Sequence, residues 1–132
     1  MPEITGTSSP VSITDHGAIR LIMVNRPDKL NALNATTLDA LHASFDAAAD
    51  DPAVRVVVLT GAGPKAFVAG ADIAEMSSLT PVQGRDFSLR GTRMMRRVER
   101  MPKPVIAMVN GFALGGGLEL AMCCHLHRIR CR

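Results

Sequence analysis

Three consecutive glycines at positions 115–117 stand just before a carboxylate, Glu119, in a chain of 132 residues. Glycine has no Cβ atom, so the backbone N–H groups of such a turn are free to face a ligand, and the expected following helix adds the positive end of its dipole. This arrangement stabilises negative charge that develops on an oxygen, as an oxyanion hole does. Glu119 falls on the first turn of that helix, where its carboxylate can exchange a proton with the polarised group.

A second loop of small residues, at positions 69–72, is the other candidate source of backbone donors. Like the glycine turn, it follows an apolar segment and precedes a predicted helix, so we expect both loops to reach the same end of one sheet. Two convergent amides would complete an oxyanion hole. Small residues before a helix also serve close packing, and the helix dipole alone favours a first-turn glutamate, so each motif leaves a structural role open.

The elements that position these loops follow from the apolar pattern. Strands are predicted at residues 11–14, 18–24, 54–60 and 105–109. Helices are predicted from a cap at Asn34 or Thr36 to about residue 50, in a short segment that Asp72 caps, at 81–101, and after the glycines. Residues 25–33 and 61–72 are expected to be loops. This order predicts an α/β fold in one domain.

Composition and charge exclude several function classes. The apolar content of 47% is enough for a folded domain with a core. Arg128, Arg130 and Arg132 account for the whole net charge of +3, and the chain has no Trp or Tyr to stack on bases, so nucleic-acid binding is not expected. No apolar run approaches the roughly 20 residues that cross a bilayer, so no membrane association and a cytoplasmic location are expected.

The sequence lacks the motifs that are typical of nucleotide-binding and metal-binding sites. Residues 61–65 do not end in the GK[ST] of a phosphate-binding loop, and no segment has the GxGxxG pattern. No metal is expected, because none of the histidines shares ligand spacing with a carboxylate. The three cysteines, Cys123, Cys124 and Cys131, are expected to be free thiols.

Three segments, in order, make the chain resemble the crotonase superfamily and its enoyl-CoA hydratases. Residues 25–33 resemble the family's NRP…NAL loop, residues 66–73 its AFxAGADI loop, and residues 103–120 its signature, with the match continuing to residue 126. The resemblance implies an α/β fold of the crotonase type, a spiral of ββα units, truncated after its first half. The expected organisation is a polar leader at 1–10, the N-terminal part of a crotonase-like domain at 11–126 and an atypical basic tail at 127–132.

The resemblance also implies roles for named residues. The two N–H groups of the oxyanion hole would come from Ala71 and Gly116, and Glu119 would be the first of two catalytic glutamates. Residues near the CoA moiety would be Lys29, Ala32, Ala69, Asp72 and Ile73. No metal and no cofactor besides the CoA of the substrate are implied.

The activity implied is addition of water to the 2,3-double bond of a trans-2-enoyl-CoA, in fatty-acid or related acyl-CoA metabolism. The resemblance further implies a homotrimer or hexamer. Two alternatives stay open: another crotonase reaction, such as isomerisation or hydrolysis of an acyl-CoA, and a catalytically inactive fragment. The second is kept because the family's other catalytic glutamate lies beyond the matching segments.

Overall fold

The computed structural model describes residues 9–130; most of the predicted polar leader, together with Cys131 and Arg132, lies outside the described residues. The strands are β1 (Val11–His16), β2 (Ile19–Val24), β3 (Val56–Gly61), β4 (Ala66–Val68), β5 (Val105–Val109), β6 (Phe112–Ala113) and β7 (Leu126–Ile129). The helices are η1 (Pro27–Lys29), a 3-10 turn, and α1 (Ala35–Asp50), α2 (Ile73–Met76), α3 (Pro81–Glu99) and α4 (Gly116–Cys123).

Five strands form the main sheet in the order β1-β2-β3-β5-β7. The hairpin β1–β2 is antiparallel, whereas β2, β3, β5 and β7 pair in parallel. The carboxyl ends of β2, β3 and β5 therefore meet at one edge of the sheet, and three loops leave from that edge. Strands β4 and β6, within two of these loops, form a separate parallel pair.

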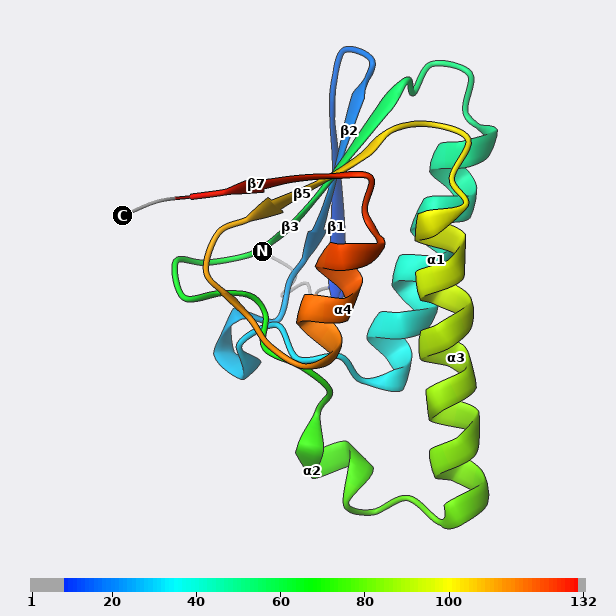
Figure 1. Ribbon diagram of the computed structural model, residues 1–132, viewed down its shortest axis with the longest axis vertical. Helices are drawn as coiled ribbons and strands as arrows, with labels where there is room; N and C mark the ends of the chain where they lie inside the picture. The colour runs from blue at the N-terminus through cyan, green and yellow to red at the C-terminus, as the bar shows by residue number, and fades with distance from the viewer. Residues whose placement is uncertain (1–8, 131–132) are drawn as a thin grey trace, which may run out of the picture.

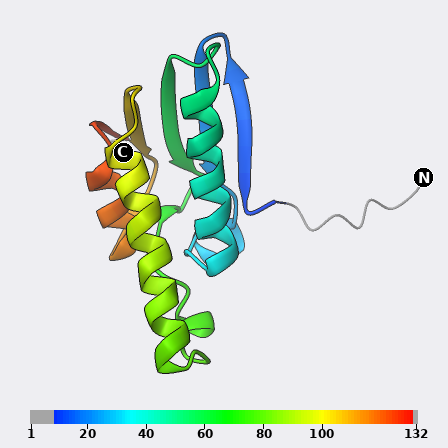
Figure 2. The ribbon, with the colours of Figure 1, turned by 90° about the vertical axis from the view of Figure 1, so that its right-hand side faces the viewer.

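Helices α1 and α3 pack on one face of the main sheet, and α3 extends well beyond it (Figures 1 and 2). The helical spacing of four apolar residues in the sequence predicts one buried face for α1, and this is confirmed, because all four are buried: Leu38, Leu41, Phe45 and Ala48. Asn34, rather than Thr36, caps this helix by accepting a hydrogen bond from the Thr37 amide at 2.9 Å. Two ion pairs, Arg90–Asp39 and Arg97–Asp46, join α3 to α1 at its solvent-facing side.

The regular structure is more extensive than the sequence predicts. The two predicted loops contain η1 and β4, and β6 separates β5 from the glycine turn. Residues 127–129, within the predicted basic tail at 127–132, are part of β7 and continue the sheet, with Val109 opposite Ile129, while the predicted division of the chain into three parts stays a prediction. Charged residues such as arginine are common on edge strands, where one side of the strand pairs with its neighbour and the other faces solvent. The basic composition of this segment therefore gave no indication that it forms a strand.

Two asparagine side chains tie the three loops together around β4. The Asn31 amide group is fully buried and donates to the carbonyls of Ala62 and Ala66, both at 2.9 Å. Asn110 donates to the same Ala66 carbonyl at 3.1 Å and to Gly61 at 2.8 Å. Because a buried amide satisfies several backbone groups at once, these bonds determine how the loops lie against each other.

Asp72 joins two of the loops electrostatically. Its carboxylate caps α2 by accepting from the Glu75 amide, as predicted, and it pairs with Arg26 at 3.0 Å. The Glu75 N–H, followed by the Arg26 guanidinium, holds the pKa of Asp72 below its ordinary value. The charged form of Asp72 therefore stabilises the folded loop pair.

A close approach at Gly117 fixes the glycine turn against β4. A Cβ atom at this position would collide with the carbonyl group of Val68. We therefore expect Gly117→Ala to lower the free energy of unfolding by about 3 kcal/mol, since the backbone must move to admit the methyl group. Gly84→Ala is the matched control: Gly84 lies within α3 with nothing near its Cβ position, and the change should add about 0.5–1 kcal/mol. Urea denaturation of both variants tests this; equal midpoints would contradict the packing argument.

Acid sensitivity tests the Asp72 linkage. A carboxyl whose pKa is lowered by folding contributes stability that is complete above its unfolded pKa and is lost as the pH falls through the folded pKa. Relative to wild type, Asp72→Asn should be less stable at pH 7, and this difference should shrink as the pH falls below about 4. Melting temperatures of both proteins between about pH 2.5 and pH 7 measure the effect, because this range brackets the pKa of an aspartate carboxyl group. Asp28→Asn, at an exposed site, is the control; a constant offset for Asp72→Asn at every pH would refute the linkage.

Candidate active site

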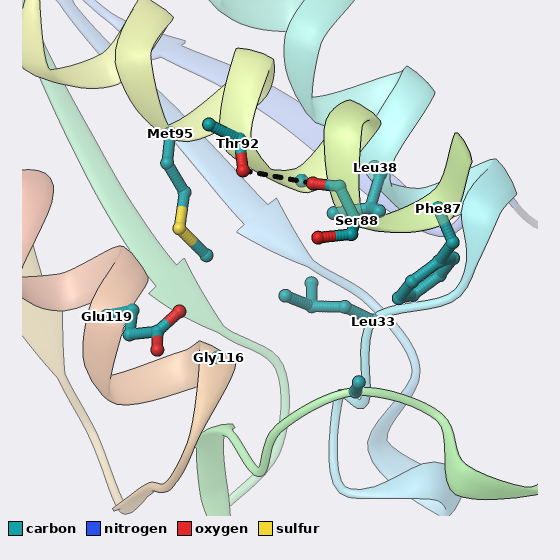
Figure 3. A pocket seen from close by; sticks show the side chains of 10 residues that line it. Leu33, Leu38, Phe87, Ser88, Thr92, Met95, Gly116 and Glu119 are labelled. Carbon is teal, nitrogen blue, oxygen red and sulfur yellow. Dashed lines mark hydrogen bonds between the residues drawn. The ribbon is translucent and has the colours of Figure 1, made fainter. Parts of the chain in front are cut away.

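A cavity of about 250 Å³ lies between α3, the start of α4 and the loops before α1 and α2. Its lining includes all three residues that the sequence singles out for the chemistry: Ala71, Gly116 and Glu119. Figure 3 shows Glu119 and Gly116 on one side of this cavity and Phe87 on the opposite side, with Leu33 and Leu38 near Phe87. The lining mixes both kinds of side chain: Met95 lies on the side of Glu119, and Ser88 lies near Leu38 (Figure 3).

Ala71 is positioned by a bridge between two loops. Leu33 pairs with Ala71, and the Leu33 amide donates to Gly70 while the Asp72 amide donates to Leu33, both at 2.8 Å. The residues before and after Ala71 therefore use their backbone groups in this bridge. Among residues 9–130, the Ala71 N–H itself donates to no protein acceptor.

Gly116 is the first residue of α4, where an amide has no acceptor within the helix. Gly115 precedes it with φ 51° and ψ −121°, a conformation that favours glycine and turns the chain sharply into the helix. Two nearby amides are occupied, because Gly117 donates to Leu114 and Glu119 donates to Gly115. Within the described part of the chain, the Gly116 N–H has no protein acceptor.

Ala71 and Gly116 lie side by side. A Cβ atom placed on Gly116 would be 4.0 Å from the Ala71 nitrogen, and it would meet Leu33 at an ordinary contact distance of 3.8 Å. Two neighbouring residues thus line one cavity with unpaired amides, one of them at the positive end of a helix. This is the arrangement that stabilises an oxyanion.

Glu119 lies on the first turn of α4, as predicted, and its carboxylate faces the cavity (Figure 3). The side chain is exposed and forms no hydrogen bond or ion pair with another described residue. It is also the only carboxylate among the described residues that line the cavity. A free carboxylate beside two free amides is equipped to bind a water molecule and accept its proton.

The residues predicted to lie near CoA come from two loops that the structure places together. Lys29 and Ile73 are exposed, whereas backbone groups of Ala32 and Ala69 bond to Arg26 and Leu30. The Asp72 carboxylate is engaged with Arg26 and the α2 amide. None of these five predicted residues lines the cavity, so a role for them toward CoA stays a prediction.

The two cysteines within the described residues, Cys123 and Cys124, are poorly suited to nucleophilic chemistry. Burial, with a smaller effect of Cys123, raises the pKa of Cys124 to about 12. The pKa of Cys123 is also raised, first by burial and then by Glu99 and Glu119. Thiolates are therefore scarce near neutral pH. The described residues also contain no cluster of three His, Cys, Asp or Glu side chains that could hold a metal ion, and no helix suited to crossing a membrane.

Sequence reasoning missed the contribution of α3 to the cavity. One face of this helix lines it with Phe87, Ser88, Gly91, Thr92 and Met95. The apolar spacing of Phe87, Met94 and Val98 predicts a core-facing helix, and that face is partly buried as expected. A glycine inside the helix, Gly91, was the available signal that something approaches closely there.

Comparison with known proteins identifies relatives of this chain. The chain is 52% identical over 106 residues to a crotonyl-CoA hydratase of Syntrophomonas wolfei, covering 80% of this chain and 41% of that protein. It is 47% identical to a short-chain-enoyl-CoA hydratase of Clostridium acetobutylicum, covering 88% of this chain and 44% of that protein. The chain thus spans less than half the length of these relatives.

Solved structures share the fold. The crystal structure of an enoyl-CoA hydratase from Bacillus anthracis superposes with a TM-score of 0.89 and 36% identity, covering 91% of this chain and 47% of that one. The predicted crotonase-type α/β fold is therefore confirmed, for about half of the fold as its relatives have it. A sequence model of the enoyl-CoA hydratase/isomerase family matches residues 14–129, and the chain belongs to that family.

Proposed function

We propose that this chain carries the oxyanion hole and one acid–base residue of an enoyl-CoA hydratase, which adds water to the 2,3-double bond of a trans-2-enoyl-CoA. The observation that carries the proposal is the shared cavity of Ala71, Gly116 and Glu119, in which both amides are unpaired among the described residues. The relatives are a crotonyl-CoA hydratase and a short-chain-enoyl-CoA hydratase, which favours a short acyl chain as substrate.

The chemistry follows from this geometry. The thioester oxygen accepts hydrogen bonds from the Ala71 and Gly116 amides, which polarise the conjugated double bond. Glu119 accepts a proton from a water molecule as the water oxygen bonds to C3, and negative charge passes to the thioester oxygen as an enolate. The enolate collapses when C2 receives a proton, which Glu119 can return. Atoms balance as one water added across one double bond.

The apolar side chains that line the cavity support the assignment to an acyl substrate. Leu33, Leu38 and Phe87 could contact a hydrocarbon chain whose thioester lies at Gly116 and Glu119, on the opposite side. Excluding water around the carbonyl strengthens the hydrogen bonds from the two amides, because the local dielectric falls. Three expectations accompany this proposal: contacts between CoA and the residues predicted to lie near it, a cytoplasmic location, and assembly into a trimer or hexamer.

A second candidate function is acyl-CoA binding without turnover. It is favoured by one observation: the described lining of the cavity offers a single carboxylate, whereas the resemblance implies a catalytic pair in hydratases. Calorimetric titration with butyryl-CoA, which has no double bond, beside a turnover assay with crotonyl-CoA separates the two. If the folded chain binds butyryl-CoA but does not hydrate crotonyl-CoA, the second function is favoured. The absence of isomerase and hydrolase activity toward acyl-CoA substrates would favour it further.

Removal of the Glu119 charge is the first test of the proposed reaction. Glu119→Gln should lower the rate of crotonyl-CoA hydration, followed by loss of enoyl absorbance, by about 10²- to 10⁴-fold, because the base is lost. Butyryl-CoA affinity should change little. Glu99→Gln, an exposed glutamate of α3 outside the cavity, is the matched control. If both variants turn over substrate equally, Glu119 is not the base.

Removal of one amide tests the oxyanion hole directly. Proline fits the first position of a helix, so Gly116→Pro deletes the N–H without losing a helical hydrogen bond. We expect kcat to fall by about 10²- to 10³-fold. Gly116→Ala keeps the N–H, its methyl group fits, and it should retain most activity. Thermal melts of both variants control for folding; similar kcat values in two folded variants would remove Gly116 from the mechanism.

A further inference from the structure

The wall that α3 contributes to the cavity has a gap at Gly91. Residues four apart in a helix lie on the same face, so Phe87, Gly91 and Met95 follow one another along this wall. Phe87 and Met95 line the cavity with large side chains, whereas Gly91 offers only its backbone. The backbone of α3 is therefore uncovered between them.

The fold does not require a glycine at this position. The φ of Gly91 is not positive, and the residue lies inside a helix, where alanine is preferred. Within residues 9–130, the nearest atom to an added Cβ, outside the backbone of the same helix, would be Leu38 Cδ1 at 3.9 Å. This is an ordinary contact distance. The missing side chain thus leaves space for a methyl group between α3 and Leu38, and both residues face the cavity.

The surroundings of this space are apolar. Leu38 is buried, and Phe87 and Met95 pack against the core. Thr92, beside Gly91, directs its hydroxyl group back to the helix, where it donates to the Ser88 carbonyl at 3.0 Å. A hydrocarbon group therefore fits this space better than a polar group, which would find few partners there.

The position of Gly91 along the cavity indicates which part of a substrate would reach it. Figure 3 shows Met95 on the side of Glu119 and Phe87 on the opposite side, so an acyl chain directed along α3 passes Gly91 between them. Gly91 lies four residues from Met95, which corresponds to about 6 Å along the helix axis. An extended chain advances about 1.2 Å per bond, so about five bonds lead from a thioester carbon at the level of Met95 to Gly91. A six-carbon acyl group has these five bonds, and a crotonyl group has only three.

We propose that Gly91 is a specificity-determining residue, whose missing side chain admits the distal carbons of 2-enoyl groups longer than crotonyl. The distal carbons would lie on the backbone of α3, with Leu38 as the opposite wall. The inference rests on the proposed function, because that function places the thioester at Gly116 and Glu119. It extends the substrate class from four-carbon to six-carbon enoyl-CoA thioesters.

Calorimetric titration with butyryl-CoA and hexanoyl-CoA measures the preference for the longer chain without requiring turnover. Gly91→Ala places a methyl group where the distal carbons would lie. The ratio of hexanoyl-CoA affinity to butyryl-CoA affinity should therefore fall at least about tenfold, the lower value for one methylene group in an apolar pocket. Gly91→Val fills more of the space and should lower the ratio further. Gly91→Ala should melt no lower than wild type, because alanine favours the helix.

Gly84→Ala is the matched control, because Gly84 lies in the same helix but not in the cavity lining, with nothing near its Cβ position. It should leave the ratio unchanged. An unchanged ratio in Gly91→Ala, or an equal loss of both affinities, would overturn the inference and leave the proposed function intact. If the folded wild-type chain binds neither acyl-CoA, the inference and the proposed function are both refuted. A lowered ratio without crotonyl-CoA hydration would uphold the inference and count against the proposed reaction alone.

Discussion

The carbonyl oxygen of Ala66 holds the site together. It accepts hydrogen bonds from Asn31 at 2.9 Å and from Asn110 at 3.1 Å, and these side chains come from the loops after β2 and β5. Ala66 itself begins β4, within the loop after β3. One backbone group therefore joins all three loops that leave the carboxyl edge of the sheet. Loops carry many polar backbone groups, so burying them requires such shared partners.

The placement of the two unpaired amides follows from this junction. Because β4 is fixed, the loop after it bridges to Leu33, and the glycine turn packs on Val68 through Gly117. These contacts use backbone groups on either side of Ala71 and after Gly116, and among the described residues they leave the Ala71 and Gly116 amides without a protein acceptor. The fold itself thus holds these two amides in place. For the function proposed above, such preorganised donors would cost no reorganisation during a reaction, which is the basis of electrostatic catalysis.

The molecule has a finished side and an open side. On the finished side α1 and α3 bury the apolar residues of β2, β3 and β5, and ion pairs cross between the helices at the surface. On the open side β7 and α4 expose apolar side chains. The cavity lies where the two sides meet, since its walls are α3 and the loop at Leu33 on one side and the start of α4 on the other. The shape of the site therefore depends on elements from both sides.

Local sequence determined much of this protein. The spacing of Leu38, Leu41 and Phe45 predicted the buried face of α1, and the position of Glu119 after three glycines placed it on the first turn of α4. Such features depend on residues within a few positions of each other, so periodicity and capping preferences reveal them. The family resemblance added the pairing of Ala71 with Gly116, which the structure shows as neighbours.

Tertiary structure alone decided the rest. Three features depend on partners far away in the chain. Asn31 and Asn110 meet at one carbonyl, α3 forms a wall of the cavity, and residues 126–129 join the sheet. A polar side chain or a basic stretch has the same local pattern whether it is solvated or paired. The physical reason is that hydrogen bonding and strand pairing are satisfied by contacts between distant segments, and no local sequence pattern specifies which distant group will be the partner.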